Sequence, residues 1–195
     1  PIYLVQNWIA EHVIAADVRK GPLSRARDHI HEKGLEERIS LRLGDGLSVL
    51  TPGEADCIII AGMGGLLMTS ILRDHPEVTD AAGTLILQPQ SDIDTVRRYL
   101  HDSGFMIEWE DMIIDEGKYY TVIRACHGKE QEYLPEDNLY GKVLIDRGHP
   151  VLIEYLHNII RKQKTIAGSL AGQDTDKCRM RIRELEESIT VSETA

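Results

Sequence analysis

Short apolar runs alternate with amphipathic segments along the first hundred residues, as in a sheet whose strands are separated by helices. Four runs are rich in aliphatic side chains and stop at Asp, Gly or Gln-Pro sequences, which predicts strands. The predicted strands cover residues 13–16, 39–43, 57–60 and 84–87. The amphipathic segments predict helices over residues 1–10, 22–34, 66–72 and 91–104, with Ser91 as the N-cap of the last one.

The pattern changes after residue 104. Residues 105–114 and 119–126 are two strand-like runs joined by Asp115–Lys118. This link is too short for a helical crossover, so the two strands are expected to be antiparallel. The predicted fold class is therefore α/β, a Rossmann-like doubly wound sheet that ends in an antiparallel β-hairpin. Class I methyltransferases that use S-adenosylmethionine end with such a hairpin.

Two helical stripes of apolar residues follow towards the C-terminus. The first begins at Val151, and the second has the spacing of the a and d positions of a coiled coil. The members of the second stripe are Cys178, Ile182, Leu185 and Ile189. The polar residues Gly172–Thr175 separate the stripes, so we expect an antiparallel helical pair. The chain is thus divided into a sheet domain, 1–130, and a coiled-coil domain, 136–195.

The least ordinary stretch of the sequence follows the predicted strand 57–60. Gly62, Gly64 and Gly65 leave only Met63 with a bulky side chain. Open α/β sheets bind ligands at the carboxyl ends of their strands, and glycine there allows a close approach of the backbone or a positive φ. The alternative is a merely tight strand-to-helix turn, for which two glycines would suffice.

Acidic residues end two other predicted strands. Asp17 follows the strand 13–16, where a carboxylate can accept hydrogen bonds from both hydroxyls of a ribose; a helix-capping Asp is the alternative. Asp45 lies between Gly44 and Gly46 after the next strand and can reach an adenine amino group; an ordinary turn Asp is the alternative. Together with the glycine stretch, these strand ends predict one ligand that contains adenosine.

Composition narrows the class of protein. The net charge of −10 counts against a broad nucleic-acid surface, but residues 136–195 hold 9 Lys and Arg against 10 Asp and Glu, whereas the preceding residues hold 13 against 22. Three scattered cysteines fit no zinc spacing and indicate a reducing cytoplasm. No apolar run is long enough to span a bilayer, and no metal-ligand cluster is predicted. Four histidines are expected at the surface: His29, His31, His75 and His149.

Basic residues cluster on both helices of the predicted coiled coil. They are Arg161, Lys162 and Lys164 on the first helix, and Lys177, Arg179, Arg181 and Arg183 on the second. Basic side chains can bind phosphates without sequence specificity, which favours an arm that grips RNA. Interleaved glutamates leave a solvated face as an alternative, and a dimerisation or packing hairpin is another.

Three motifs together resemble a known family. They are Ile60-Ala61-Gly62-Met63-Gly64-Gly65, the preceding Gly44-Asp45-Gly46, and the later Glu116-Gly117-Lys118-Tyr119-Tyr120. The chain resembles, over nearly its whole length, the bacterial tRNA (adenine-N1)-methyltransferases that modify the adenine at tRNA position 22. The resemblance implies S-adenosylmethionine as cofactor, tRNA as partner, a cytoplasmic enzyme, and neither metal nor membrane. We expect a monomer rather than a homodimer.

The same resemblance assigns site residues. The cofactor would contact Asp17, Val18, Gly44, Asp45, Gly46, Ala61, Gly62 and Met63. Gly62, Met63 and Gly64 would line the reaction site, and the basic residues of the coiled coil would bind tRNA. A noncatalytic RNA-binding or regulatory module that keeps the fold is the alternative function.

One part of the family pattern is not in this sequence. The family has its first strand and an acidic glycine loop just upstream of the position of Pro1, and that loop holds the methionine part of the cofactor and a carboxylate proposed to act in catalysis. We therefore expect the chain to be a fragment of the functional enzyme. The predicted strands 13–16 and 57–60 should then flank the absent strand and should not pair with each other.

Overall fold

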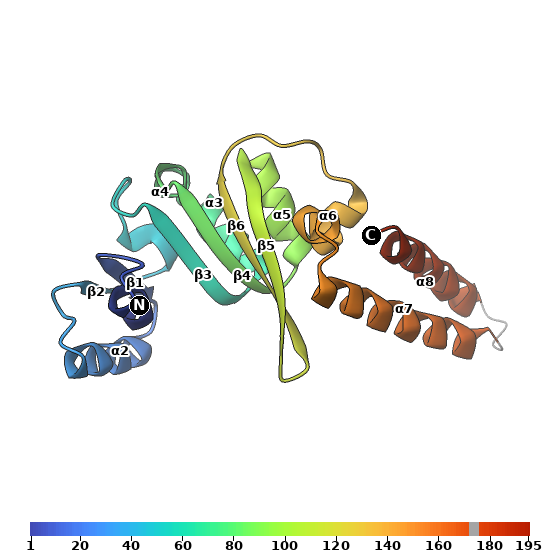
Figure 1. Ribbon diagram of the computed structural model, residues 1–195, viewed down its shortest axis with the longest axis horizontal. Coiled ribbons are helices and arrows are strands. Elements are labelled where there is room, and N and C mark those ends of the chain that lie inside the picture. Colours follow the sequence, from blue (N-terminus) through green and yellow to red (C-terminus); the bar gives the residue numbers. More distant parts are fainter. Residues whose placement is uncertain (172–175) are drawn as a thin grey trace. The chain divides into compact units, whose positions relative to one another are not determined.

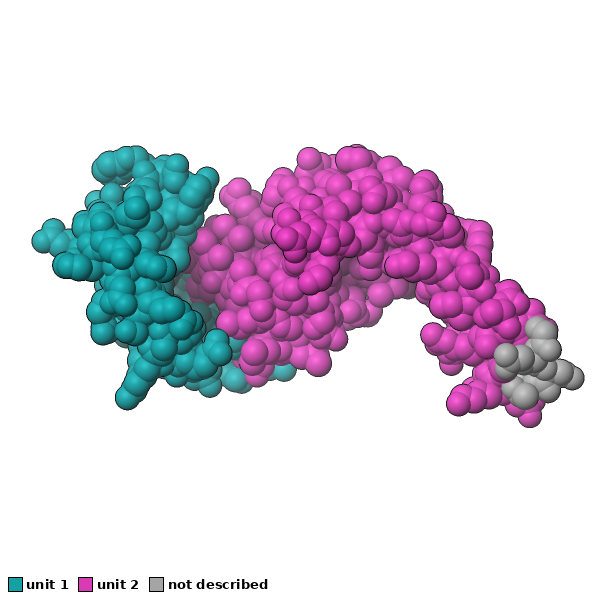
Figure 2. Space-filling view, turned by 90° about the horizontal axis from the view of Figure 1, so that it is seen from below, with its two compact units in different colours: residues 1–55, 71–82 teal, residues 56–70, 83–195 magenta. Residues whose placement is uncertain are grey.

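The computed structural model describes residues 1–171 and 176–195. The chain forms two compact units, which Figure 2 colours separately. The smaller unit comprises residues 1–55 and 71–82, and the larger unit comprises residues 56–70 and 83–195. Each unit has its own sheet and its own apolar core.

The smaller unit is built on two parallel strands, β1 (Val13–Asp17) and β2 (Ile39–Leu43). Its other elements are α1 (Ile2–Gln6), α2 (Lys20–Glu32), the 3-10 turn η1 (Gly46–Val49) and α4 (Pro76–Ala81). Val5, Ile30 and Ile39 are buried together and join α1, α2 and β2 in one core. The predicted strand, helix and strand of this region are confirmed.

The larger unit contains a four-stranded sheet with the order β3-β4-β6-β5. Its strands are β3 (Cys57–Gly64), β4 (Thr84–Ser91), β5 (Phe105–Asp115) and β6 (Lys118–His127). β3 and β4 are parallel, and β6 is antiparallel to both of its neighbours, which confirms the terminal hairpin (Figure 1). Helices α3 (Gly65–Arg73) and α5 (Ile93–Asp102) follow β3 and β4. β1 and β3 belong to different sheets, so the expectation that they do not pair is confirmed.

Two long helices, α7 (Pro150–Leu170) and α8 (Asp176–Thr194), follow the π-turn η2 (Asp137–Gly141) and α6 (Lys142–Asp146). α7 and α8 lie side by side (Figure 1), and the Gln163 amide donates to the Ser188 hydroxyl at 2.8 Å. The predicted helical pair is therefore present. The break predicted at Gly172–Thr175 lies outside the described residues, and the coiled-coil geometry stays a prediction.

The first turns of α7 belong to the core of the larger unit. Leu152 and Leu156 are buried in one cluster with Leu144 of α6 and Met112 of β5. Burial of these leucines removes apolar surface from water and fixes the start of α7 on the hairpin. The sheet and the C-terminal helices of this unit are thus joined by apolar packing as well as by the chain.

A buried ion pair lies beside this cluster. Arg97 of α5 and Glu110 of β5 are 1% and 0% exposed, with 2.8 Å between Nε and Oε1. Arg97 Nη1 also donates to the carbonyls of Asn138 and Leu139, at 2.9 and 3.0 Å. Burial raises the pKa of Glu110, and the charge of Arg97 opposes that rise. The pair connects α5, β5 and η2 at the point from which the C-terminal helices begin.

Three local predictions are wrong. The helix predicted over 1–10 ends at Gln6, and Trp8 has a left-handed backbone (φ 56°) and is 80% exposed. Ser91 does not cap α5, because the N-cap is Asp92, whose carboxylate accepts from the Ser91 hydroxyl at 2.6 Å. The expected glycine turn is instead the end of β3, which continues to Gly64 with two irregularities in its register.

Candidate active site

The glycine segment, Ala61–Gly65, forms the carboxyl end of β3 and the first residue of α3. Gly62 has φ 76°, and no heavy atom lies within 4 Å of the place that a Cβ would take. Its conformation therefore requires glycine, while the space beside it is open. The Gly62 N–H donates to Gln88 Oε1 at 3.0 Å, and Met63 is 39% exposed. This end of β3 offers open backbone to a ligand.

Gly64 and Gly65 have a different role, since neither has a positive φ. A Cβ on Gly64 would lie 3.1 Å from Ser91 Oγ, and a Cβ on Gly65 would lie 2.4 Å from the carbonyl oxygen of Asp92. These two glycines let the start of α3 pass close to the turn between β4 and α5. Close packing thus accounts for Gly64 and Gly65, whereas Ala61–Met63 remain candidates for ligand contact.

The smaller unit brings two groups of predicted ligand residues together. The Gly44 N–H donates to the Asp17 carbonyl at 3.2 Å, so the carboxyl ends of β1 and β2 are adjacent. Asp17 Oδ1 accepts the Arg19 N–H at 2.8 Å, which orders the turn into α2. It does not cap that helix, because the N-cap is Arg19 and α2 has no side-chain cap hydrogen bond. Val18 is 57% exposed and Asp45 is exposed, so both can meet a ligand.

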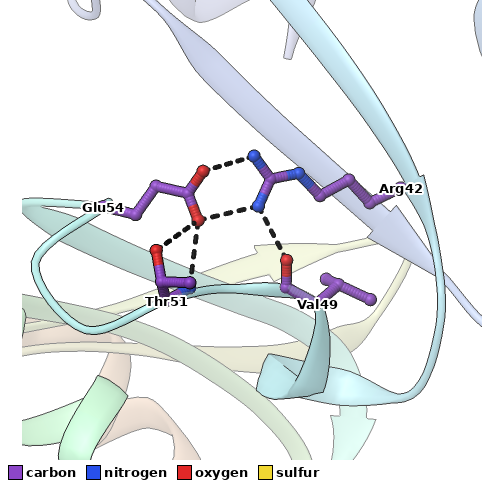
Figure 3. A network of polar contacts seen from close by, with 4 residues as sticks. All are labelled: Arg42, Val49, Thr51 and Glu54. Carbon is purple, nitrogen blue, oxygen red and sulfur yellow. Dashed lines mark hydrogen bonds and ion pairs between the residues drawn. The ribbon is translucent and has the colours of Figure 1, made fainter.

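A polar network holds the loop that begins at Gly44–Gly46 (Figure 3). Arg42 Nη1 donates to the Val49 carbonyl and to Glu54 Oε2, both at 2.7 Å, and Nη2 donates to Glu54 Oε1. The Thr51 N–H also donates to Glu54 Oε2, at 3.0 Å. Hydrogen bonds from Arg42 and from the Thr51 amide lower the pKa of Glu54 to about 2. An ionised Glu54 and the Val49 carbonyl therefore hold the later part of this loop, Val49–Glu54, on Arg42 of β2.

The predicted RNA-binding residues lie along α7 and α8, but they are not equivalent. Three form ion pairs with acidic neighbours: Lys164 with Glu193 at 2.7 Å, Arg179 with Asp176 at 2.7 Å, and Arg181 with Glu184 at 2.8 Å. Arg161 donates to the Asn158 side chain at 2.8 Å. Lys162, Lys177 and Arg183 are exposed and form no ion pair with any described residue. These last three are the best placed to meet phosphates.

One histidine contradicts the expectation of a surface position. The His149 side chain is 12% exposed, its Nε2 lies 2.9 Å from Asp111 Oδ1, and its Nδ1 is buried without a partner among the described residues. A proline after a histidine is typical of an exposed loop, but Pro150 is here the first residue of α7, which packs on β5. His29 and His31 are exposed, and His75 is half-buried.

Neither a metal cluster nor a membrane span was found in the described part of the chain. No group of three or more His, Cys, Asp or Glu side chains there could hold a metal ion. None of the helices described is long and apolar enough to cross a membrane.

The class of protein follows from the sheet and the strand ends. The parallel strands β3 and β4, which continue into an antiparallel hairpin and carry an open glycine segment at the carboxyl end of β3, have the arrangement of a Rossmann-like methyltransferase. The family model described as tRNA (adenine(22)-N(1))-methyltransferase, TrmK, matches residues 1–194. The chain belongs to this family.

Individual relatives agree with this assignment. The curated tRNA (adenine(22)-N(1))-methyltransferase of Bacillus subtilis is 31% identical over 191 residues, which are 95% of this chain and 80% of the relative. The crystal structure of the B. subtilis enzyme has a TM-score of 0.86 at 29% identity and covers 100% of this chain and 86% of that one. Streptococcus pneumoniae Sp1610, a putative tRNA (m1A22) methyltransferase solved with S-adenosyl-L-methionine, has a TM-score of 0.78 at 29% identity, covering 97% and 86%. The predicted fold class and family are confirmed.

The sequence did not reveal a cavity of about 540 Å³ in the larger unit. Its lining includes Asp92, Tyr119, Tyr140 and Tyr155. Lys118, Tyr119 and Tyr120 line it from a motif noted in the sequence, whereas Asp92, Tyr140 and Tyr155 come from separate elements that the fold brings together. No spacing rule could have grouped them.

Proposed function

We propose that this protein transfers the methyl group of S-adenosylmethionine to N1 of the adenine at position 22 of tRNA. The observation that carries the proposal is the family match over residues 1–194, which agrees with the open glycine segment at the end of β3. The relatives named above are described as tRNA methyltransferases, and one was solved with the cofactor.

The residues present fit an adenosine-containing cofactor. The Asp17 carboxylate can accept hydrogen bonds from ribose hydroxyls while its Oδ1 also holds the turn into α2. Asp45 can accept from the adenine amino group, and Val18 can pack on the ring. Gly44 and Gly46 would contact the cofactor through their backbone, because a Cβ would lie 2.2 Å from Val49 Cγ1 at Gly44 and 2.9 Å from Ile71 Cγ2 at Gly46. Ala61–Met63 would lie against the reacting end of the cofactor.

The cofactor supplies an electrophilic methyl group on a sulfonium centre. Adenine N1 lies on the Watson–Crick edge, so the base must be unpaired before N1 can attack. Attack needs near-linear alignment, and positioning by the glycine segment would supply much of the rate. Positive charge moves onto the ring as the methyl group arrives, and backbone carbonyls at Ala61–Gly64 could stabilise it through the exocyclic amine. N1 would attack with its own lone pair while the C–S bond of the sulfonium breaks and S-adenosylhomocysteine leaves. No proton has to be removed for this transfer, so a strong base is not required.

The proposal extends to the domains of the chain. The chain would comprise a methyltransferase domain, 1–130, and a C-terminal coiled-coil domain, 136–195, whose basic residues bind tRNA phosphates. A monomeric, cytoplasmic enzyme without a metal or a membrane partner completes the proposal.

Mass spectrometry of nucleosides tests the reaction. Total tRNA from cells with and without the protein should differ in 1-methyladenosine, and purified tRNA with adenine replaced at position 22 should accept no methyl group. Calorimetry with S-adenosylmethionine on the full-length protein provides a second measurement. Cofactor binding without any gain of 1-methyladenosine would contradict the proposed reaction, and the absence of both would favour a noncatalytic RNA-binding or regulatory module.

A further inference from the structure

The tyrosine-lined cavity lies within the larger unit, where the start of α5, the β5–β6 hairpin and α7 meet. Its volume of about 540 Å³ is within the range of pockets that bury a small molecule or one nucleotide. Met112 and Leu152 of the apolar core form part of its wall, so the cavity has an apolar side. Its rim is polar and includes Gln90, Asp92 and Lys118.

The aromatic part of the wall is held in place by hydrogen bonds and ring contacts. The Tyr119 and Tyr155 rings meet edge to face with 4.9 Å between their centroids. The Tyr119 hydroxyl donates to Glu154 Oε1 at 3.0 Å and accepts from Asn158 at 2.9 Å. Tyrosine rings are stacking surfaces for unstacked nucleobases, and rings that are already ordered lose little entropy when a base binds.

The rim carries a carboxylate in an unusual position. Asp92 is the N-cap of α5 but makes no capping hydrogen bond, and its backbone is left-handed, with φ 52°. Its Oδ2 accepts from the Ser91 hydroxyl at 2.6 Å. A carboxylate that is not used by the helix can accept a hydrogen bond from the exocyclic amino group of a base. Adenine and cytosine carry such a donor, whereas uracil does not.

The same rim touches the glycine segment. Ser91 and Asp92 line the cavity and are also the residues on which Gly64 and Gly65 pack. We propose that the cavity holds an amino-bearing base of the tRNA that has been turned out of its stack, with the tyrosines as the stacking surface and Asp92 as the acceptor for the amino group. This inference rests on the proposed function, because it takes tRNA as the substrate.

Nuclear magnetic resonance titration tests the chemistry of the cavity. The probes are adenosine 5′-monophosphate and inosine 5′-monophosphate, which share the purine ring system, ribose and phosphate and differ at position 6, where the first has an amino group and the second a carbonyl oxygen. Saturating S-adenosylhomocysteine fills the cofactor site, so shifts of the Tyr119, Tyr140 and Tyr155 ring signals report the cavity. We expect adenosine monophosphate to bind at least tenfold more tightly than inosine monophosphate. Asp92→Gly, which removes the side-chain acceptor and tolerates the left-handed backbone, should remove this preference. Asp102→Gly, at the exposed far end of the same helix, should keep it.

Filter binding and methyl transfer with tRNA give the second measurement. Asp92→Gly and Tyr155→Leu should each weaken tRNA affinity about tenfold, with unchanged affinity for S-adenosylmethionine. Thermal unfolding checks each variant, and Asp92→Gly decides alone if Tyr155→Leu does not fold. If the wild type methylates tRNA but the variants keep both the tRNA affinity and the base preference, the inference is overturned and the proposed function stands. A wild type that methylates no tRNA would instead refute the proposed function.

Discussion

Arg97→Met should destabilise the larger unit strongly. The substitution keeps a side chain of similar length but removes the guanidinium that neutralises Glu110 and binds the carbonyls of Asn138 and Leu139. Both partners of the ion pair are at most 1% exposed, so water cannot take the place of the guanidinium. Removing one partner of a buried pair costs about 3–5 kcal/mol. This is a large share of the ~5–15 kcal/mol that stabilises a typical domain.

The pH dependence distinguishes a buried charge from a simple loss of packing. Burial raises the pKa of Glu110 above its usual value, and without Arg97 nothing comparable opposes that rise. An acid whose folded-state pKa is raised is stabilising while it is protonated, and that stability is lost as the pH rises from the unfolded pKa through the folded pKa. The difference in unfolding free energy between wild type and Arg97→Met should therefore shrink as the pH falls from 7 towards the usual glutamate pKa.

Urea unfolding followed by tryptophan fluorescence measures the effect. Trp8 and Trp109 belong to different units, so a Trp8→Phe background leaves Trp109 of β5 as the reporter of the larger unit. The double variant Arg97→Met/Glu110→Met removes both charges and should be more stable than Arg97→Met alone. A loss below about 1 kcal/mol, or a double variant less stable than the single one, would refute the reasoning.

Four further predictions concern the site and the helices. Asp17→Ala should weaken binding of S-adenosylmethionine by about 2–3 kcal/mol in calorimetry, through loss of two charge-assisted hydrogen bonds. Gly62→Val should abolish methyl transfer yet cost only about 1–3 kcal/mol of stability, because the strain of a positive φ is not accompanied by a clash. Glu54→Gln should remove an acid-labile contribution to stability: with its pKa lowered to about 2, the ionised Glu54 stabilises the fold above the usual glutamate pKa, and this is lost as the pH falls towards 2. Three exposed basic residues, Lys162, Lys177 and Arg183, can be replaced by Gln. The slope of the logarithm of the tRNA binding constant against the logarithm of the salt concentration should then decrease in magnitude by about 0.7–0.9 for each phosphate that is no longer neutralised.

Matched variants control these measurements. Asp28→Asn on the exposed face of α2 should leave cofactor affinity unchanged. If Asp17→Ala also left it unchanged, Asp17 would have only a structural role in the turn into α2. Gly104→Val, with φ 79° and no atom within 4 Å of its Cβ position, should reproduce the stability loss of Gly62→Val with full activity. The control set for the salt experiment is Lys164, Arg179 and Arg181, which form ion pairs. An equal change of slope in both sets would contradict the choice of the three residues that form no ion pair with a described residue.

The strands and the hairpin could be predicted from the sequence because local signals and tertiary packing agree there. The run Cys57–Ile60 is apolar and bounded by polar residues, and the link between 114 and 119 is too short for anything but a hairpin. Helix boundaries were predicted less accurately where tertiary contacts determine them. The chain leaves α1 at Trp8, whose left-handed backbone is disfavoured for a bulky side chain and was therefore not expected from the sequence.

The polar interior could not be predicted for a different reason. Arg97 and Glu110 look like ordinary surface residues of a helix and a strand, and only their pairing across α5 and β5 makes burial tolerable. His149 is similar, because its acceptor Asp111 lies on a strand that is distant in sequence. The ligand residues nominated at strand ends stay a prediction. Within the smaller unit the fold does bring the ends of β1 and β2 together, since the Gly44 N–H donates to the Asp17 carbonyl.

The contact between Gly65 and the backbone of residue 92 also has an evolutionary consequence. Any side chain gained at position 65 would point at a main-chain oxygen, and backbone cannot be replaced by a smaller group as a side chain can. A lineage could lose this glycine only if the turn between β4 and α5 were rebuilt at the same time. The glycine segment, Ala61–Gly65, and the cavity rim at Ser91 and Asp92 are therefore expected to change together among related sequences.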